Sequence, residues 1–296
     1  MSQLELQQLL MAAKDQAPDL SDEPHEIRRK FDAMLEPLPY DSRLNLSSRA
    51  IGSIEGLWVD APHLNSGRIL LYLHGGAYVF GGSTSYRSLG AALANTCQAP
   101  CFIPDYRLAP EHPYPAAVND VLTVYQDLLN QGYEASHISL IGDSAGGGLS
   151  LALLVSAREK GLPLPGNVVL LSPWADLAMT GESLTRQAER DPLLTEAGLR
   201  KSSLLYLKDL PPDTPLASPL YSDLTGLPPM LIQVGSREIL LSDAVRIAER
   251  AGLVDVSVEL SIWPGMVHVW QLFSAHLSEA RLALNAIGRF VLSQQK

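Results

Sequence analysis

The sequence predicts an α/β protein in which helices cover both faces of a central, mostly parallel β-sheet. Two observations predict this class. Short, continuous apolar runs, typical of strands buried on both faces, alternate along the chain with longer segments of helical periodicity. The 296 residues are 46% hydrophobic and 18% charged, which indicates a globular chain with a substantial core.

Residues 1–45 are expected to be mainly helical and to precede the sheet. Apolar side chains recur with helical spacing in residues 4–13 and again in residues 27–34, and Pro18 and Pro24 interrupt the pattern. Amphipathic helices ahead of the first strand need a surface to pack on. We expect this segment to cover the mouth of the main domain, to form a partner surface, or to be a packed structural arm.

The main domain is expected to span residues 46–296. Residues 49–59 alternate well enough for one bent strand or two short ones. Residues 176–222 break the strand–helix alternation, contain several prolines and show no strand, so we expect an inserted segment there. The other expected strands are 68–73, 99–104, 138–142, 168–171, 230–234 and 257–262, and the helices are 85–95, 116–130, 149–158, 242–251 and 278–292.

A candidate nucleophile stands between the strand at 138–142 and the helix that follows it. The segment Gly142-Asp143-Ser144-Ala145-Gly146 fits the nucleophile elbow G-x-S-x-G, a tight strand-to-helix turn with serine at its apex. Gly142 and Gly146 would let strand and helix approach closely around a strained serine. Because glycine and serine are common residues, this pentapeptide can occur by chance. Other catalytic residues, elsewhere in the chain, must therefore support the assignment of Ser144 as a nucleophile.

A serine hydroxyl needs a general base, and that base needs an orienting carboxylate. In the α/β-hydrolase fold these partners follow the serine in the order acid, then histidine. Of seven histidines only His268 and His276 follow Ser144. His276 lies in a helical pattern, whereas His268 lies in a loop directly after the last expected strand. We therefore predict His268 as the base.

Two carboxylates follow the strand at 230–234. Glu238 stands in the immediate turn, and Asp243 stands at the start of the next helix, where a capping or helix-dipole role is common. We predict Glu238 as the acid and keep Asp243 as the alternative.

The oxyanion of a tetrahedral intermediate needs backbone N–H donors. One is expected from Ala145, the residue after the nucleophile. The others are expected from Gly75 and Gly76, in the glycine-rich loop that follows the strand at 68–73. His74 is expected to orient that loop. Candidate pocket walls are Tyr78, Phe80 and Trp174, each of which could instead belong to the core.

Three motifs in this order resemble the hormone-sensitive-lipase family of microbial esterases: residues 74–77 (HGGA), residues 105–117 (DYRLAPEHPYPAA) and residues 142–147 (GDSAGG). The resemblance implies that residues 1–45 and 176–222 form a helical cap over the site of an α/β-hydrolase domain. It also implies short- to medium-chain acyl ester substrates, no cofactor, and a homodimer formed through the last strand and helix. The chain departs from the family at Glu238, where an aspartate is common.

We therefore interpret the chain as a serine carboxylesterase with a small-molecule ester as its substrate. The sequence leaves open an amidase or deacetylase that uses the same triad. It also leaves open a ligand receptor of the same fold without turnover, although such receptors typically lose the histidine and His268 is present.

The net charge and the cysteine content limit the binding partners and the cellular compartment that we expect. The net charge of −10, without a basic cluster, argues against nucleic acid or an anionic membrane as a partner. Cys97 and Cys101 lack metal-site spacing, so we expect two free thiols and no metal site. With no signal peptide pattern and no long apolar run, we expect a cytoplasmic location.

Overall fold

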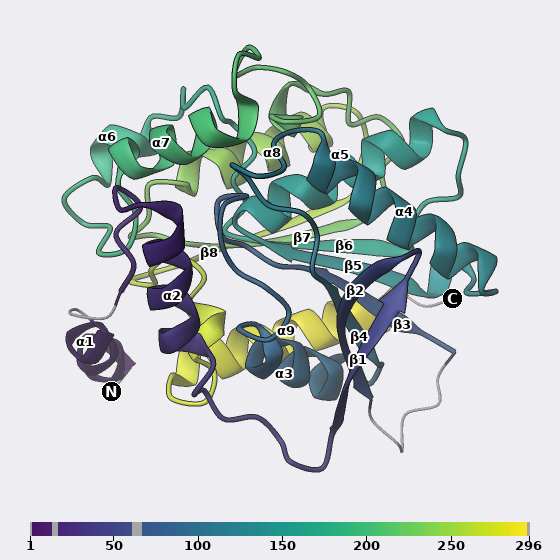
Figure 1. The fold of residues 1–296 in the computed structure, drawn as a ribbon, viewed down its shortest axis with the longest axis horizontal. Coiled ribbons are helices and arrows are strands. Elements are labelled where there is room, and N and C mark those ends of the chain that lie inside the picture. The colour runs from purple at the N-terminus through teal and green to yellow at the C-terminus, as the bar shows by residue number, and fades with distance from the viewer. Residues whose placement is uncertain (1, 14–16, 61–66, 295–296) are drawn as a thin grey trace.

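The computed structural model describes residues 2–13, 17–60 and 67–294, and its centre is a twisted sheet (Figure 1). Within these ranges eight strands pair in the order β1-β2-β4-β3-β5-β6-β7-β8. Their bounds are β1 (Asn45–Ile51), β2 (Ile54–Asp60), β3 (Ile69–Leu73), β4 (Cys101–Pro104), β5 (Ile138–Asp143), β6 (Asn167–Leu171), β7 (Met230–Gly235) and β8 (Val258–Trp263). From β4 onward in this order, neighbouring strands pair in parallel. The β1–β2 and β2–β4 pairs are antiparallel. This mostly parallel sheet confirms the predicted α/β class.

Burial explains why the central strands read as continuous apolar runs. Every residue of β3, β5, β6 and β7 is buried, because helices cover both faces of the sheet. The segment 49–59 adopts the second of its two expected forms, a hairpin of β1 and β2. Gly52, with φ of +59°, provides the left-handed turn between these strands.

Two helical layers sandwich the sheet (Figure 1). One layer consists of α3 (Arg87–Cys97) and α9 (Ser278–Ser293), which pack on each other. The other consists of α4 (Ala116–Asn130), α5 (Ala145–Glu159) and α8 (Leu241–Gly252). Cys97 and Cys101 are free and buried in this core.

Two segments gather at one end of the sheet, where α2, α6 and α7 lie near one another (Figure 1). The N-terminal segment forms α1 (Ser2–Ala13) and α2 (Pro24–Leu35). Pro24 begins α2 instead of interrupting a helix, because the missing N–H costs nothing in the first turn. Residues 176–222, all of which the structure describes, form α6 (Ser183–Arg186), α7 (Glu196–Leu207) and the short turn η2 (Pro219–Tyr221) without a strand.

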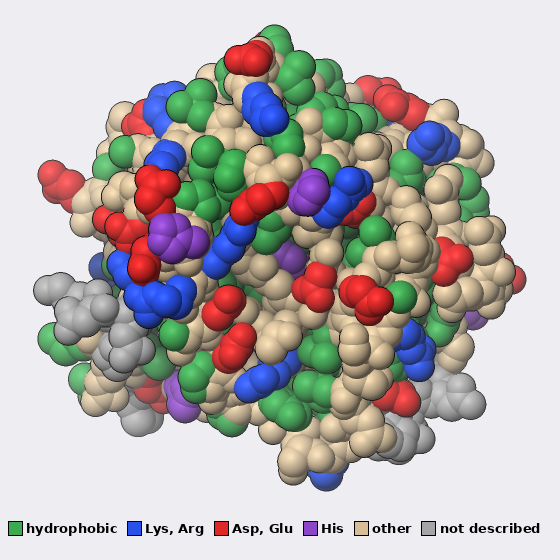
Figure 2. All heavy atoms as spheres, in the orientation of Figure 1, with side chains coloured by type: hydrophobic (Ala, Val, Ile, Leu, Met, Phe, Trp, Pro, Cys, Tyr) green, Lys and Arg blue, Asp and Glu red, His purple; other side chains and the backbone are tan. Residues whose placement is uncertain are grey.

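Acidic and basic side chains are interspersed over the face that carries these two segments (Figure 2). Among the helices in the described ranges, none is both long enough and apolar enough to cross a bilayer.

Candidate active site

Ser144 occupies the sharp turn between β5 and α5, with φ of 50° and ψ of −121°. A positive φ with this ψ is strained for a residue with a side chain, and close packing enforces it. A Cβ on Gly142 would lie 2.2 Å from the Gly146 carbonyl oxygen, and a Cβ on Gly146 would lie 2.0 Å from that of Leu73. Both glycines are therefore required for strand and helix to meet around the serine.

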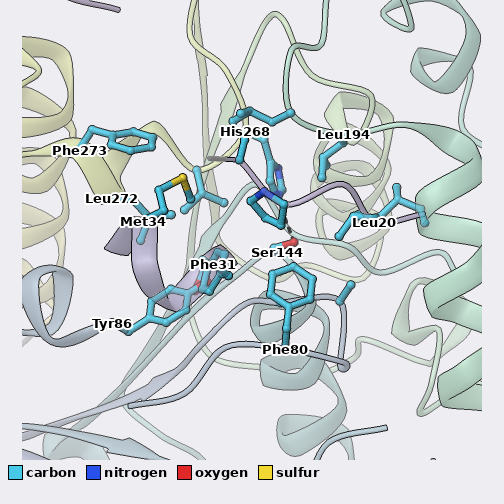
Figure 3. A pocket seen from close by; sticks show the side chains of 18 residues that line it. Leu20, Phe31, Met34, Phe80, Tyr86, Ser144, Leu194, His268, Leu272 and Phe273 are labelled. Atoms are coloured by element: carbon cyan, nitrogen blue, oxygen red, sulfur yellow. Dashed lines mark hydrogen bonds between the residues drawn. The ribbon is translucent and has the colours of Figure 1, made fainter. Parts of the chain in front are cut away.

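The three predicted triad residues form one hydrogen-bonded chain, of which Figure 3 shows the part between His268 and Ser144. His268 Nε2 lies 2.9 Å from Ser144 Oγ, and its Nδ1 lies 2.8 Å from Glu238 Oε2. The second carboxylate oxygen of Glu238, Oε1, accepts the Gly235 N–H at 2.6 Å and the Ser172 hydroxyl at 2.8 Å. All three side chains are buried, so each is held in one orientation.

Opposing effects set the pKa of His268. Burial disfavours the imidazolium, but the hydrogen bond and negative charge of Glu238 favour it, with smaller contributions from Asp191 and Asp143. The net result is a His268 pKa above its ordinary value. This imidazole therefore accepts a proton more readily than an isolated histidine does.

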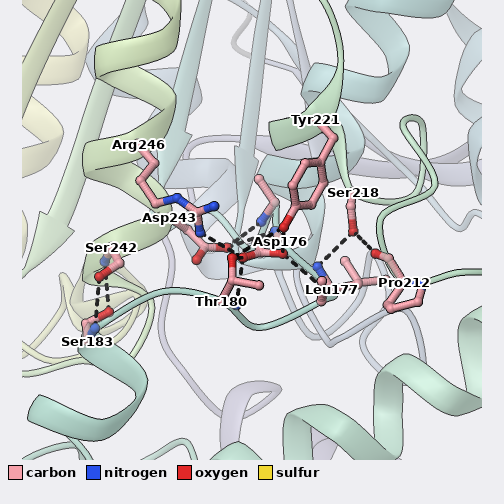
Figure 4. Close-up of polar contacts among 12 residues, drawn as sticks. Asp176, Leu177, Thr180, Ser183, Pro212, Ser218, Tyr221, Ser242, Asp243 and Arg246 are labelled. Atoms are coloured by element: carbon pink, nitrogen blue, oxygen red, sulfur yellow. Dashed lines mark hydrogen bonds and ion pairs between the residues drawn. The ribbon is translucent and has the colours of Figure 1, made fainter.

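The alternative acid, Asp243, belongs to a different group of polar contacts, shared with Asp176 and Arg246 (Figure 4). Its Oδ2 accepts the N–H groups of Ala175 and Asp176, both at 2.9 Å, and it makes no hydrogen bond with His268. The adjacent Asp176 pairs with Arg246 at 2.8 Å. Burial raises the pKa of Asp243 to about 7. Asp243 therefore fixes the loop after β6.

The glycine-rich loop differs from the prediction at one residue. The Gly75 N–H donates to Asp143 Oδ1 at 2.8 Å, so it is not free to bind an oxyanion. The N–H groups of Gly76, Ala77 and Ala145 have no hydrogen-bond acceptor among the described residues, and Gly76 and Ala77 line the pocket at Ser144. The hydrogen bond to Asp143 therefore speaks against the expectation for Gly75, whereas Ala77, which the sequence did not single out, presents an N–H group without an acceptor beside the pocket.

Asp143 joins the elbow to this loop. Besides the Gly75 N–H, it accepts the hydroxyl groups of Tyr72 at 2.5 Å and Tyr86 at 3.0 Å. Burial raises the pKa of Asp143 to about 6 despite these bonds. Beneath the loop, the Tyr106 hydroxyl donates to the His74 carbonyl at 2.6 Å. Asp143 and Tyr106 thus hold the loop against the sheet.

An apolar pocket opens beside Ser144 (Figure 3). Of the three predicted walls, Phe80 lines it, whereas Tyr78 and Trp174 do not. Tyr78 is buried against Tyr206, with ring centroids 3.9 Å apart, and Trp174 is fully buried. The sequence did not single out the apolar walls Ala17, Pro18, Leu20, Phe31, Met34, Leu193, Leu194, Leu199, Val269, Leu272 and Phe273.

All of these walls come from the N-terminal segment, from the inserted segment or from the residues that follow β8. Leu20, Phe31 and Met34 belong to the N-terminal segment, and Leu193 and Leu194 belong to the inserted one. In the described ranges no group of three or more His, Cys, Asp or Glu side chains is arranged to hold a metal ion.

Comparison with known proteins places this fold and geometry in a family. Residues 70–272 match the model of an alpha/beta hydrolase fold family. An acetyl-hydrolase of Streptomyces hygroscopicus is 44% identical over 81% of this chain and 80% of the relative. An esterase of Acinetobacter venetianus is 36% identical over 91% of this chain and 89% of the relative.

A solved structure gives a narrower assignment. The crystal structure of an esterase from the bacterial hormone-sensitive lipase family superposes with a TM-score of 0.95 at 40% identity, covering 99% of this chain and 98% of the other. The chain therefore belongs to the α/β-hydrolases and, among them, to the bacterial hormone-sensitive-lipase family of esterases.

Proposed function

We propose that the protein is a serine carboxylesterase that hydrolyses short- to medium-chain acyl esters through Ser144, His268 and Glu238. The observation that carries the proposal is the hydrogen-bonded chain from Glu238 through His268 to Ser144, whose last two members line an apolar pocket. The similarity to proteins named esterase and acetyl-hydrolase supports an ester substrate with a small acyl group.

In the first half-reaction, Ser144 Oγ attacks the ester carbonyl while its proton passes to His268 Nε2. Glu238 holds the Nδ1 proton, which leaves Nε2 free as the acceptor and stabilises the imidazolium that forms. The tetrahedral intermediate collapses as Nε2 returns the proton to the leaving alcohol. Water then attacks the acyl-enzyme by the same route, and the acid is released.

Gly76, Ala77 and Ala145 are the oxyanion donors in this mechanism, because their N–H groups border Ser144 and have no acceptor among the described residues. Each such donor typically contributes about 3 kcal/mol of transition-state stabilisation.

Residues 1–45 and 176–222 act as the cap in this proposal, because both contribute pocket walls. Figure 3 places Met34, Leu272 and Phe273 on one side of Ser144 and Leu20 and Leu194 on the other. An ester bound at Ser144 could place its acyl group on one side and its alcohol on the other. Both sides favour neutral, apolar groups.

The test is Ser144→Ala assayed on p-nitrophenyl acetate. By analogy with other serine triads, kcat should fall by about 10⁶-fold, and the wild type should release a burst of nitrophenol if deacylation is slow. A variant that turns over at the wild-type rate would exclude the mechanism, and a wild type without hydrolysis would favour the receptor alternative.

A further inference from the structure

Arg28 of α2 binds the backbone of the loop that carries the proposed oxyanion donors. Its Nε donates to the Val79 carbonyl at 2.8 Å, and its Nη2 donates to the Ala109 carbonyl at 2.9 Å. The same guanidinium binds both carboxylate oxygens of Glu111, at 2.9 and 2.7 Å. One side chain from the N-terminal segment therefore holds two loops of the main domain.

The loop under Arg28 has a backbone that needs external support. Ala77 and Tyr78 both adopt left-handed conformations, with φ of 51° and 63°. Such conformations in residues with side chains persist only where the surroundings enforce them. The N–H groups of Val79 and Phe80 donate to the Gly76 carbonyl at 2.8 and 2.9 Å, so the Val79 peptide and the Gly76 and Ala77 donors belong to one turn.

Two further side chains of α2 contact the same loop. The Phe31 and Phe80 rings meet edge to face, with centroids 4.8 Å apart. Asp32 Oδ1 accepts the Ser85 hydroxyl at 2.5 Å. Since Phe31 and Phe80 also line the pocket, α2 contributes to the substrate site as well as supporting the turn that carries the Gly76 and Ala77 N–H groups.

We propose that Arg28 is a positioning residue for ester hydrolysis: it fixes the Val79 and Ala109 carbonyls and so aims the Gly76 and Ala77 N–H groups at the oxyanion. This proposal rests on the proposed function. A guanidinium suits the task because its rigid, planar fork directs several N–H donors at once, whereas a lysine ammonium is a point charge on a flexible stem. Docking of the N-terminal segment is thereby coupled to transition-state stabilisation.

The experiment compares Arg28→Ala with Arg29→Ala, a matched control on the same helix whose guanidinium binds only Glu26 in the described structure. Losing one well-aimed oxyanion donor costs about 10²–10³ in kcat, so partial misalignment in Arg28→Ala should cost about 10–100-fold. KM should stay within about 3-fold, and Arg29→Ala should match the wild type. Inhibition by an aryl boronic acid, whose tetrahedral adduct at Ser144 places an oxygen among the same donors, should weaken in parallel with kcat.

Chemical rescue separates positioning from general stability. Millimolar guanidinium should raise kcat of Arg28→Ala several-fold and leave the wild type unchanged, because the free ion can occupy the vacated site between the two carbonyls. Glu111→Ala should lose less than Arg28→Ala, since it leaves both carbonyl bonds in place.

Three outcomes would overturn the proposal: a kcat of Arg28→Ala within 2-fold of the wild type, a loss confined to KM, or a loss that guanidinium does not restore. If Arg28→Ala does not fold, Arg28→Lys provides the test, with an expected loss of kcat at unchanged KM. Failure here leaves the Ser144→Ala result intact, so it is distinct from failure of the proposed function.

Discussion

Glu238→Gln is expected to lower kcat by about 10⁴-fold, although glutamine has nearly the same shape as glutamate. Oε1 of Glu238 accepts two hydrogen bonds, from the Gly235 N–H and the Ser172 hydroxyl. In the variant the amide oxygen must remain there, because an NH₂ group would face two donors. The NH₂ group is then directed at His268 Nδ1, which must become an acceptor, and the ring proton moves to Nε2. In that tautomer the imidazole cannot accept the Ser144 proton, and an Asp→Asn change in a comparable triad costs about 10⁴ in kcat.

The assay is initial-rate hydrolysis of p-nitrophenyl acetate, with the melting temperature recorded for each variant. Asp243→Asn is the matched control: it replaces another buried carboxylate of the same region, and its amide oxygen can still accept the Ala175 and Asp176 N–H groups. Its kcat should stay within about 3-fold of the wild type. A Glu238→Gln enzyme with more than a tenth of wild-type activity, or a larger loss in Asp243→Asn, would refute Glu238 as the acid.

Two predictions concern pH. Because the pKa of His268 is raised above 6.5, kcat/KM should fall on the acid side with a midpoint above pH 6.5, and a midpoint at or below that value in a pH–rate profile would contradict the base assignment. The folded pKa of Asp243, about 7, exceeds its ordinary value of 3.8, so its contribution to stability is present below about pH 4 and is lost as pH rises through 7. Asp243→Asn removes this loss, which is at most about 4 kcal/mol at about 1.4 kcal/mol per pKa unit. Its melting temperature relative to the wild type should therefore rise between pH 4 and 8, and a constant difference would contradict the burial argument.

The fold was largely predictable because its core strands carry a strong local signal. β3, β5, β6 and β7 are buried on both faces, and their apolar runs ended within about one residue of the observed strands. The least certain region, residues 49–59, lies at the edge of the sheet in a hairpin whose β1 is mostly exposed. Exposure on one face weakens the apolar pattern, so one bent strand and two short ones looked alike.

The site was predictable where chain order and turn chemistry define it. Ser144, Glu238 and His268 each follow a strand, and the structure brings them into hydrogen-bonding contact. Pocket walls such as Met34 and Leu194 depend on how α2 and the inserted segment pack on the main domain, which no local pattern encodes. Gly75 was predicted as an oxyanion donor because glycine exposes its N–H group. In the structure that N–H already donates to the carboxylate of Asp143, which is far from Gly75 in the sequence.

The geometry of the proposed triad follows from four adjacent parallel strands. Ser144 follows β5, Ser172 follows β6, Glu238 follows β7 and His268 follows β8, and these strands are neighbours in the sheet. Neighbouring strands lie about 4.8 Å apart, so β8 is about 14 Å from β5, and the loop after β8 must fold back over the strand ends for His268 to reach Ser144.

The Ser172 hydroxyl helps hold that loop in place: it donates to Glu238 Oε1 at 2.8 Å and accepts the Val269 N–H at 3.2 Å. Val269, the residue after His268, has φ of 45°, a conformation that needs such support. A glutamate suits this arrangement because its length lets one oxygen reach His268 while the other remains bound between β6 and β7. One shared hydroxyl therefore helps to position both the proposed acid and the proposed base, and a glutamate in place of the family's common aspartate is compatible with the proposed triad.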